Sequence, residues 1–378
     1  MKIAPFLVEE WMNAYETKAK YNIAETCVNS LSLREVLALA GENEAAFTEK
    51  MMSGRLTYGA IEGRPAFLSG IAKLYKTVQA NEVIPTHGAA GANHHVFTAL
   101  ISAGDHVISI MPTYQQLYSI PASIGADVSI LELRKEDGYL PDVARLKALC
   151  RPDTKMICIN NPNNPTGALM NEAQLREIVE IARSCGAYLL CDEVYRHLTQ
   201  TDEYSPSVAD LYEKGISVSS MSKVFSLAGI RLGWMATHDE AARRAFLSRR
   251  DYNLISCGML DEMIAETALA NGEKILARNR KIVRENLALL DGWMKNHPQL
   301  SWVKPEAGTT AFVYYDDTLS SREFCTRLLM ETGALVTPGE CFGYEKCFRI
   351  GYACGNQELR EGLAAMDRFL KKREQERA

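Results

Sequence analysis

Three apolar segments, each followed by polar residues suited to chemistry, constrain the fold of this chain most strongly. The segments are Met156–Ile159, Ala187–Cys191 and Ile216–Val218, and they lead into the loop 160–167, Asp192 and Lys223. Short apolar runs of this kind predict buried strands, and the stretch 172–184 has helical spacing. Because parallel strands joined by helices present their carboxyl ends at one edge of a sheet, we expect an α/β fold that gathers these side chains.

Lys223 is the first candidate for catalysis. An amine at the end of a buried strand is partly desolvated, which lowers its pKa and makes it a nucleophile toward carbonyl groups. Nearby, Ser220, Ser222 and Arg231 offer the hydroxyls and the planar cation that bind a phosphate monoester. An amine beside a phosphate site suggests pyridoxal 5′-phosphate. A single lysine after a strand is more often a solvated loop charge, so this interpretation depends on the residues around it.

Two of those residues follow the other strands. Asp192 closes an apolar strand, and an aspartate there is costly to bury without a cationic partner. The protonated pyridine nitrogen of pyridoxal phosphate would be such a partner. The loop 160–167, with the sequence Asn-Asn-Pro-Asn-Asn-Pro-Thr-Gly, contains two Asn-Pro steps and is stiff enough to hold one amide side chain in place.

Further candidates lie at other element ends. Tyr114 follows a predicted strand and could stack on a flat cofactor, although core packing is the commoner role of such an aromatic. The small-residue turn 87–93 leaves backbone N–H groups free for an anion. Arg349 lies in an apolar strand without an acid nearby, so a substrate carboxylate could pair with it. Glu25, in an extended arm, is either a solvated acid or a contact for a cationic substrate group.

Composition excludes several other classes of function. With 42 Lys and Arg against 47 Asp and Glu, the net charge of −5 provides no field for nucleic acid or an anionic membrane. Residues 1–10 include two glutamates and no long apolar core, so we expect no signal peptide and no membrane anchor. Ten cysteines without a Cys-x-x-Cys pair predict reduced, buried thiols in a cytoplasmic protein. The adjacent His94 and His95 point in different directions, and we expect no metal site.

Length and pattern predict two domains. A chain of 378 residues favours more than one core. We expect residues 46–265 to form a large cofactor-binding domain and residues 266–378 a smaller α+β domain, which a helix and arm at 1–45 join. The small domain should contain long helices within 262–293, strands near 309–315, 334–337 and 347–352, and a closing helix at 358–372.

Four motifs occur in an order that resembles the class I and II aminotransferases, which are fold-type I pyridoxal-phosphate enzymes. They are Asn-Asn-Pro-Asn-Asn-Pro-Thr-Gly, Asp-Glu-Val-Tyr, Ser-Met-Ser-Lys with an arginine eight residues later, and Phe-Arg-Ile-Gly-Tyr. The resemblance covers nearly the whole chain. It implies a mostly parallel sheet sandwiched by helices, a smaller α+β domain, and transfer of an amino group between an L-amino acid and a 2-oxo acid through a Schiff base on Lys223.

The resemblance also implies a role for each matching residue. Lys223 would move the proton, Asp192 would pair with the pyridine nitrogen, and Asn164 and Tyr195 would bond the ring hydroxyl. Tyr114 would stack on the ring and Arg349 would bind the substrate α-carboxylate. The implied phosphate site consists of Gly88, Ala89, Ala90, Ser220, Ser222 and Arg231. Tyr58 matches a tyrosine that reaches the phosphate of a neighbouring subunit, which implies a homodimer with shared active sites.

Two alternatives remain open at this point. The segment from Glu10 to Val28 is similar to the capreomycidine-synthase-like branch, whose members act on arginine derivatives, so elimination and cyclisation compete with transamination. Glu25 would then contact a guanidinium group. A pyridoxal-phosphate domain can also act as a ligand sensor in a transcription regulator, but such proteins carry a helix-turn-helix domain and a basic linker, and we expect neither here.

Overall fold

The computed structural model describes residues 2–377, and its largest element is a seven-stranded sheet with the order β2-β8-β7-β6-β5-β3-β4. Neighbouring strands from β7 to β4 are parallel, whereas β8 is antiparallel to both β2 and β7. The strands are β2 Val83–His87, β3 His106–Met111, β4 Asp127–Glu132, β5 Thr154–Asn160, β6 Tyr188–Asp192, β7 Gly215–Ser220 and β8 Leu232–Ala236. This mostly parallel sheet confirms the predicted α/β class.

Helices cover both faces of this sheet, because the side chains of its strands alternate between two apolar cores. Leu190 of β6 packs in one core with Phe97 of α5, and its neighbour Leu189 packs in the other with Ile178 of α8. Such strands are apolar on both faces, as buried parallel strands must be. The helices of this part are α5 Gly88–Leu100, α6 Gln116–Ile124, α7 Val143–Leu149, α8 Glu172–Cys185, α9 Val208–Leu211 and α10 Glu240–Arg250.

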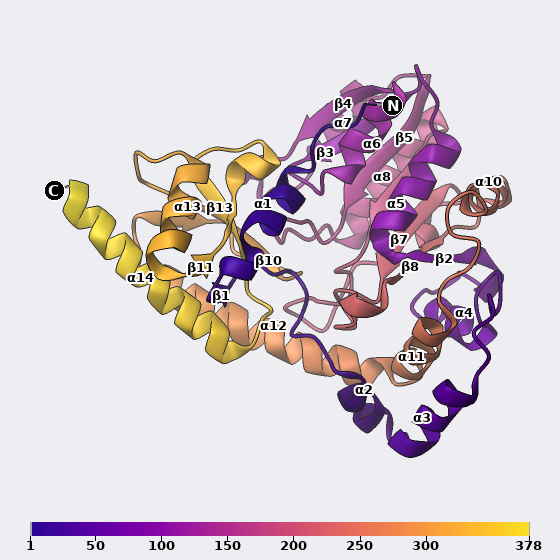
Figure 1. Cartoon of the computed structure of the whole chain (residues 1–378). Helices are drawn as coiled ribbons and strands as arrows, with labels where there is room; N and C mark the ends of the chain where they lie inside the picture. Colours follow the sequence, from indigo (N-terminus) through magenta and orange to yellow (C-terminus); the bar gives the residue numbers. More distant parts are fainter. Residues whose placement is uncertain (1, 378) are drawn as a thin grey trace.

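A smaller antiparallel sheet of four strands, ordered β12-β13-β10-β9, lies apart from the large sheet (Figure 1). Its strands are β9 Leu300–Trp302, β10 Thr310–Tyr315, β12 Thr337–Pro338 and β13 Cys347–Gly351. The helices that accompany it are α12 Gly272–Met294, α13 Ser321–Thr332 and α14 Asn356–Arg377. The preceding helix, α11 Met259–Ala270, packs instead against α2 Leu33–Ala40 and α4 Pro65–Ala72. In Figure 1, α12 runs along the lower side of the molecule from α11 toward α14. This arrangement confirms the predicted smaller α+β part.

The N-terminal region contacts the small sheet before the chain enters the large one. Helix α1, Leu7–Tyr15, places the Trp11 indole N–H 3.0 Å from the carbonyl oxygen of Val336. Strand β1, Tyr21–Asn22, pairs in parallel with β11, Ala334–Leu335. The chain then continues as an arm, residues 23–31, and as the helices α2 Leu33–Ala40, α3 Glu44–Ser53 and α4 Pro65–Ala72. Ser32 caps α2 in a capping box with Glu35.

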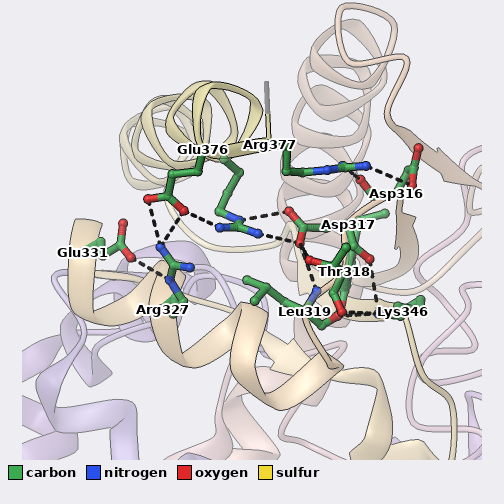
Figure 2. Close-up of polar contacts among 11 residues, drawn as sticks. Asp316, Asp317, Thr318, Leu319, Arg327, Glu331, Lys346, Glu376 and Arg377 are labelled. Carbon is green, nitrogen blue, oxygen red and sulfur yellow. Dashed lines mark hydrogen bonds and ion pairs between the residues drawn. The ribbon is translucent and has the colours of Figure 1, made fainter.

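The C-terminal helix is tied to the small sheet by ion pairs, which Figure 2 shows. Arg373 of α14 donates to both carboxylate oxygens of Asp317, at 3.0 and 2.8 Å. Both side chains are nearly buried, with exposed fractions of 8% and 5%. Glu376 also accepts from Arg373. In Figure 2, Glu376 accepts from Arg327 of α13. None of the helices within residues 2–377 is long and apolar enough to cross a bilayer.

Candidate active site

A cavity of about 320 Å³ lies at the carboxyl ends of β5, β6 and β7. Parallel pairing brings these strand ends together, with Asn160 opposite Asp192 and Asp192 opposite Val218. The cavity is lined by twelve of the residues singled out in the sequence, namely Glu25, Ala89, Ala90, Tyr114, Asn164, Asp192, Tyr195, Ser220, Ser222, Lys223, Arg231 and Arg349. Residues from the first, middle and last parts of the chain therefore meet in one place.

The Lys223 side chain extends into this cavity, where its amine has two partners from the N-terminal arm. Lys223 Nζ donates to Thr26 Oγ1 at 2.7 Å and to Cys27 Sγ at 3.2 Å. Burial alone would lower the pKa of Lys223, but the Cys27 thiol, Tyr195 and Glu25 together raise it above its ordinary value. The expectation that burial leaves this amine with a lowered pKa is therefore wrong for this structure, because the neighbouring acidic groups outweigh desolvation.

Asp192 ends β6 with its carboxylate buried below the cavity. Its Oδ2 accepts from Asn93 Nδ2 of α5 at 3.1 Å, and its Oδ1 accepts from the backbone N–H of Val194 at 3.2 Å. Burial raises the pKa of Asp192 to about 6, although both hydrogen bonds and the charge of Lys223 act to lower it. Within residues 2–377, the hydrogen-bond partners of this carboxylate are these two neutral donors. A cation brought beside it would lower that pKa and fix the charge.

The turn from β2 into α5 forms an anion cradle with the loop after β7. Gly88 begins α5 with φ of +67°, and a Cβ at this position would lie 2.8 Å from Arg231 Nη2. A Cβ at Gly233 would lie 2.3 Å from the Gly88 carbonyl carbon, so only glycine fits there. The first turn of α5 has free backbone N–H groups that can donate to an anion. The same end of the cavity contains the exposed Arg231 and the hydroxyls of Ser220 and Ser222.

Arg349 of β13 enters the cavity from the small sheet. Its Nη1 donates to Asn164 Oδ1 at 3.2 Å, and its Nη2 donates to the Ala24 carbonyl and to Thr337 Oγ1, each at 3.1 Å. The Nε–H, which is buried, has no hydrogen-bond partner among the described residues. Burial lowers the pKa of Arg349 although Tyr195 and Glu25 raise it. A buried guanidinium with a free N–H is suited to a carboxylate ligand.

The two tyrosines of the cavity are buried beside these groups. Tyr195 follows β6 and is 3% exposed. Tyr114 follows β3, and its ring centroid lies 5.1 Å from that of Phe6 at the start of the chain. Burial raises the pKa of Tyr114, so this phenol stays neutral. The N-terminal segment therefore packs against the ring that was predicted to stack on a cofactor.

Glu25 lies in the arm and faces the same cavity. Its Oε1 accepts from the backbone N–H groups of Thr26 and Cys27, both at 2.7 Å. Burial would raise the pKa of Glu25, but the charge of Lys223 and these N–H groups keep it below its ordinary value. The carboxylate is therefore ionised at neutral pH and contributes negative charge to the cavity.

Gly88 and Tyr58 are not among the residues that line the cavity. Gly88 lies against the Arg231 guanidinium, since a Cβ at residue 88 would lie 2.8 Å from Arg231 Nη2. Tyr58 lies in the segment between α3 and α4, where its side chain is 68% exposed and its carbonyl accepts from Ser256 Oγ at 2.9 Å. Within one chain, Tyr58 is therefore a surface residue.

Comparison with known proteins decides the family. The family model described as "Aminotransferase class I and II" matches residues 27–366, which is most of the chain. The chain belongs to the class I and II aminotransferase family. Members of this family use pyridoxal 5′-phosphate, so the protein is a pyridoxal-phosphate-dependent enzyme with the fold that the four motifs predict.

Relatives in this aminotransferase family carry out more than one reaction. Capreomycidine synthase of Streptomyces vinaceus is 26% identical and aligns over 96% of this chain and 93% of its own. The arginine–pyruvate transaminase AruH of Pseudomonas aeruginosa is 29% identical over 84% and 83% of the two chains. A solved pyridoxal-phosphate-dependent aminotransferase of Streptococcus suis is 45% identical, with a TM-score of 0.96 and 99% of both chains covered. The cyclase OrfR is 27% identical, with a TM-score of 0.91 over 99% and 98%.

The residues present in this aminotransferase-family chain fit the cofactor at both of its ends. The buried Asp192 carboxylate, with its raised pKa, lacks the cation that a protonated pyridine nitrogen supplies. The cradle of Gly88 and Arg231 provides donors for a phosphate, and it is too narrow for a side chain. The Lys223 amine lies in the same cavity and is a nucleophile suited to an aldehyde. The fit to the cofactor therefore depends on the charge of Asp192, the shape of the Gly88–Arg231 cradle and the nucleophilic amine of Lys223.

Sequence reasoning missed three residues that contact the central groups. Thr26 and Cys27 bond Lys223, and Asn93 bonds Asp192. Asn93 could have been found, because it is an amide on a face of α5 that otherwise carries apolar residues such as Val96 and Phe97. The two arm residues give no such signal, since their partner lies almost 200 positions later in the chain.

Proposed function

We propose that this protein is an aminotransferase that moves an amino group between an L-amino acid and a 2-oxo acid. The observation that carries the proposal is the shared cavity of Lys223, Asp192 and Arg349. The Lys223 amine suits the cofactor aldehyde, and the buried Asp192 anion suits the protonated ring nitrogen. The buried Arg349 cation suits the α-carboxylate of an amino acid. Each of the three comes from a different part of the chain, so folding alone brings them together.

In the proposed reaction each residue has one task. When bound, pyridoxal 5′-phosphate supplies an aldehyde for the amino group and a ring that accepts the electrons released at the substrate Cα. Asp192 keeps a proton on the ring nitrogen, and Arg349 orients the substrate by its α-carboxylate. Lys223 Nζ would take the proton from the substrate Cα and deliver it to the carbon of the cofactor's aldehyde group. Asn164 and Tyr195 bond the ring hydroxyl and Tyr114 covers the ring face.

The phosphate is assigned to the cradle at the start of α5. Its donors are Gly88, Ala89, Ala90, Ser220, Ser222 and Arg231. Backbone N–H groups carry most of this site, because residues 89–91 have no hydroxyl. No group of three or more His, Cys, Asp or Glu side chains within residues 2–377 could hold a metal ion.

The test is an absorbance spectrum of the purified protein followed by a panel of amino acids. Addition of a true amino donor should bleach the cofactor band and yield the matching 2-oxo acid in equal amount. Borohydride should fix the cofactor to Lys223, as peptide mass spectrometry would show. Labelling of any other lysine, or colourless protein after incubation with the cofactor, would disprove the proposal.

A second candidate is a lyase or cyclase that acts on an arginine derivative. Four charged residues of the cavity already have roles toward the cofactor or the substrate carboxylate, namely Asp192, Lys223, Arg231 and Arg349. The other charged residues that line the cavity are Glu9, Glu16 and Glu25. This remaining negative charge favours a substrate with a cationic side chain over a dicarboxylic acid. Capreomycidine synthase and the cyclase OrfR are similar along nearly the whole chain. Release of ammonia or water without a 2-oxo acid product would favour this candidate.

Glu25 can be examined by Glu25→Gln, which keeps the size of the side chain and removes its charge. If Glu25 contacts the substrate, this change raises KM for arginine about tenfold more than KM for a neutral amino acid. An equal change for both would show that Glu25 only supports the arm.

We also propose a homodimer with shared active sites. Large apolar side chains are exposed together where the segment 52–61 meets the segment after α10, namely Met52, Leu56, Tyr58, Ile61, Tyr252 and Ile255. The hydrogen bond from Ser256 to Tyr58 places the two segments side by side. A second copy would cover this surface and bring Tyr58 to its phosphate. Light scattering that gives the mass of one chain would contradict the dimer.

The domain division of residues 1–45, 46–265 and 266–378 remains a proposal. The pairing of β1 with β11 and the contact of Trp11 with Val336 support assigning the N-terminal part to the small domain. Ten free cysteines support a reducing compartment, and we propose the cytoplasm.

A further inference from the structure

The contact between the N-terminal arm and Lys223 joins two distant parts of the chain. Lys223 Nζ donates to Thr26 Oγ1 at 2.7 Å, which is a short distance for an amine and a hydroxyl, and to Cys27 Sγ at 3.2 Å. Thr26, Cys27 and Lys223 all line the candidate active site. The amine therefore has two defined hydrogen-bond partners in the arm.

The arm is held firmly enough to place these partners. The Gly351 N–H donates to the Ile23 carbonyl at 2.8 Å, and Thr309 Oγ1 donates to the Thr26 carbonyl at 2.8 Å. Arg349 Nη2 donates to the Ala24 carbonyl at 3.1 Å. Ile23 and Ala24 are fully buried. Strands β10 and β13 thus fix the backbone on either side of Glu25, so the side chains at 26 and 27 have little freedom.

We infer that Thr26 and Cys27 are positioning residues that hold the amine of Lys223 in its protonated form whenever it is not bonded to the cofactor. The inference rests on the proposed bond between Lys223 and the cofactor. A hydroxyl oxygen that accepts from an ammonium stabilises the charge, and the neutral amine can donate only more weakly. The arm would therefore set how much neutral, reactive amine is present at a given pH.

Several titratable groups face Lys223 besides Cys27. Glu25 comes from the arm, Asp192 and Tyr195 from β6 and the loop after it, and Tyr114 from the loop after β3. Thr26 is the one hydrogen-bond partner of the amine that cannot ionise. Changing Thr26 therefore removes a contact without changing the charge of the site.

The test measures how fast cofactor-free protein recombines with pyridoxal 5′-phosphate, by absorbance, between pH 6 and 10. Thr26→Val keeps the shape and removes the hydroxyl, and Thr26→Ser keeps the hydroxyl. For the natural protein the rate should rise with pH as the amine of Lys223 loses its proton. We expect the Thr26→Val profile to move about one pH unit lower, which is about tenfold faster recombination on the rising side. Thr26→Ser should follow the natural profile.

Two further measurements keep the result interpretable. Thr26→Ala should shift the profile in the same direction, and Cys27→Ala should shift it less, because the thiol is the weaker and more distant acceptor. Trinitrophenylation of Lys223 in cofactor-free protein, followed by peptide mass spectrometry, should show the same order of reactivity. Protonation of free cofactor affects all variants alike and cancels in the comparison.

An unchanged profile in folded Thr26→Val and Thr26→Ala, with the cofactor still on Lys223, would overturn the inference and leave the proposed function intact. An equal shift in Thr26→Ser would also overturn it, because a structural disturbance would then explain both variants. Failure of the natural protein to attach the cofactor at Lys223 would instead refute the proposed function.

Discussion

Replacement of Gly351 by alanine should displace the arm that carries Glu25, Thr26 and Cys27. A Cβ at residue 351 would lie 1.9 Å from the Glu25 carbonyl oxygen and 2.9 Å from its carbonyl carbon. Normal separation begins near 3.4 Å, so the arm would have to retreat by about 1.5 Å. Both neighbours are backbone atoms, which cannot yield by changing a rotamer. The hydrogen bond from the Gly351 N–H to Ile23 would lengthen with them.

The size of the effect follows from this displacement. Crowding a packed site costs about 1–3 kcal/mol, and a weakened backbone hydrogen bond costs about 1 kcal/mol more. A shift of about 1 Å in groups that position a reacting amine lowers the rate about 100-fold. We therefore expect Gly351→Ala to lower kcat/KM about 100-fold and to lower the melting temperature by a few degrees.

Gly355→Ala is the matched control, because a Cβ there meets no atom within 4 Å. Steady-state kinetics with the best amino donor and a thermal unfolding scan should be recorded for both variants. Wild-type kinetics and melting temperature in Gly351→Ala would refute the packing argument. Comparable losses in Gly355→Ala would show that the arm is not responsible.

Three further predictions concern ion pairs. Arg373→Ala should lower the free energy of unfolding, measured in urea, by about 3 kcal/mol, because the nearly buried Asp317 carboxylate would lose its cationic partner. A loss below about 0.5 kcal/mol would show that water reaches this carboxylate. Burial would raise the pKa of Asp317, but the hydrogen bonds from Arg373 keep it below its ordinary value. The stability that this pair contributes should therefore be complete above the unfolded pKa of about 4 and disappear as pH falls through the lower folded pKa, so the two proteins should converge in acid. Arg349→Lys should raise KM for the amino donor at least tenfold while the cofactor spectrum stays unchanged, since lysine lacks the fork that binds a carboxylate; an unchanged KM would place the substrate carboxylate elsewhere.

The sequence alone predicts that Asp192 and Lys223 lie at one edge of the sheet, because an apolar strand precedes each of them. Asp192 and Lys223 each follow an apolar strand, and parallel pairing of β6 and β7 leaves both at the same end. Arg349 was found by a related argument, as a charge without a local partner in an apolar strand. The capping box at Ser32 is likewise encoded within four residues.

Properties that depend on distant neighbours could not be predicted in this way. The direction of the pKa shift of Lys223 depends on Cys27 and Glu25, which reach it only through the pairing of the arm with the small sheet. Desolvation alone suggested the opposite direction. The role proposed for Tyr58 depends on a second subunit, and the single chain leaves this residue exposed. The limit in each case is a contact that no local sequence pattern contains.

The crossing arm also affects when this protein can become functional during its synthesis. Arg349, the partner of Ala24, is made 325 positions after it. At about 5–20 residues per second, this interval is roughly 15 to 65 seconds. During the last part of that time, after Ala236 has been made, the large sheet has its strands but its cavity lacks one wall. A nascent chain should therefore hold the vitamin-derived coenzyme poorly until Arg349 has been made and has reached the arm.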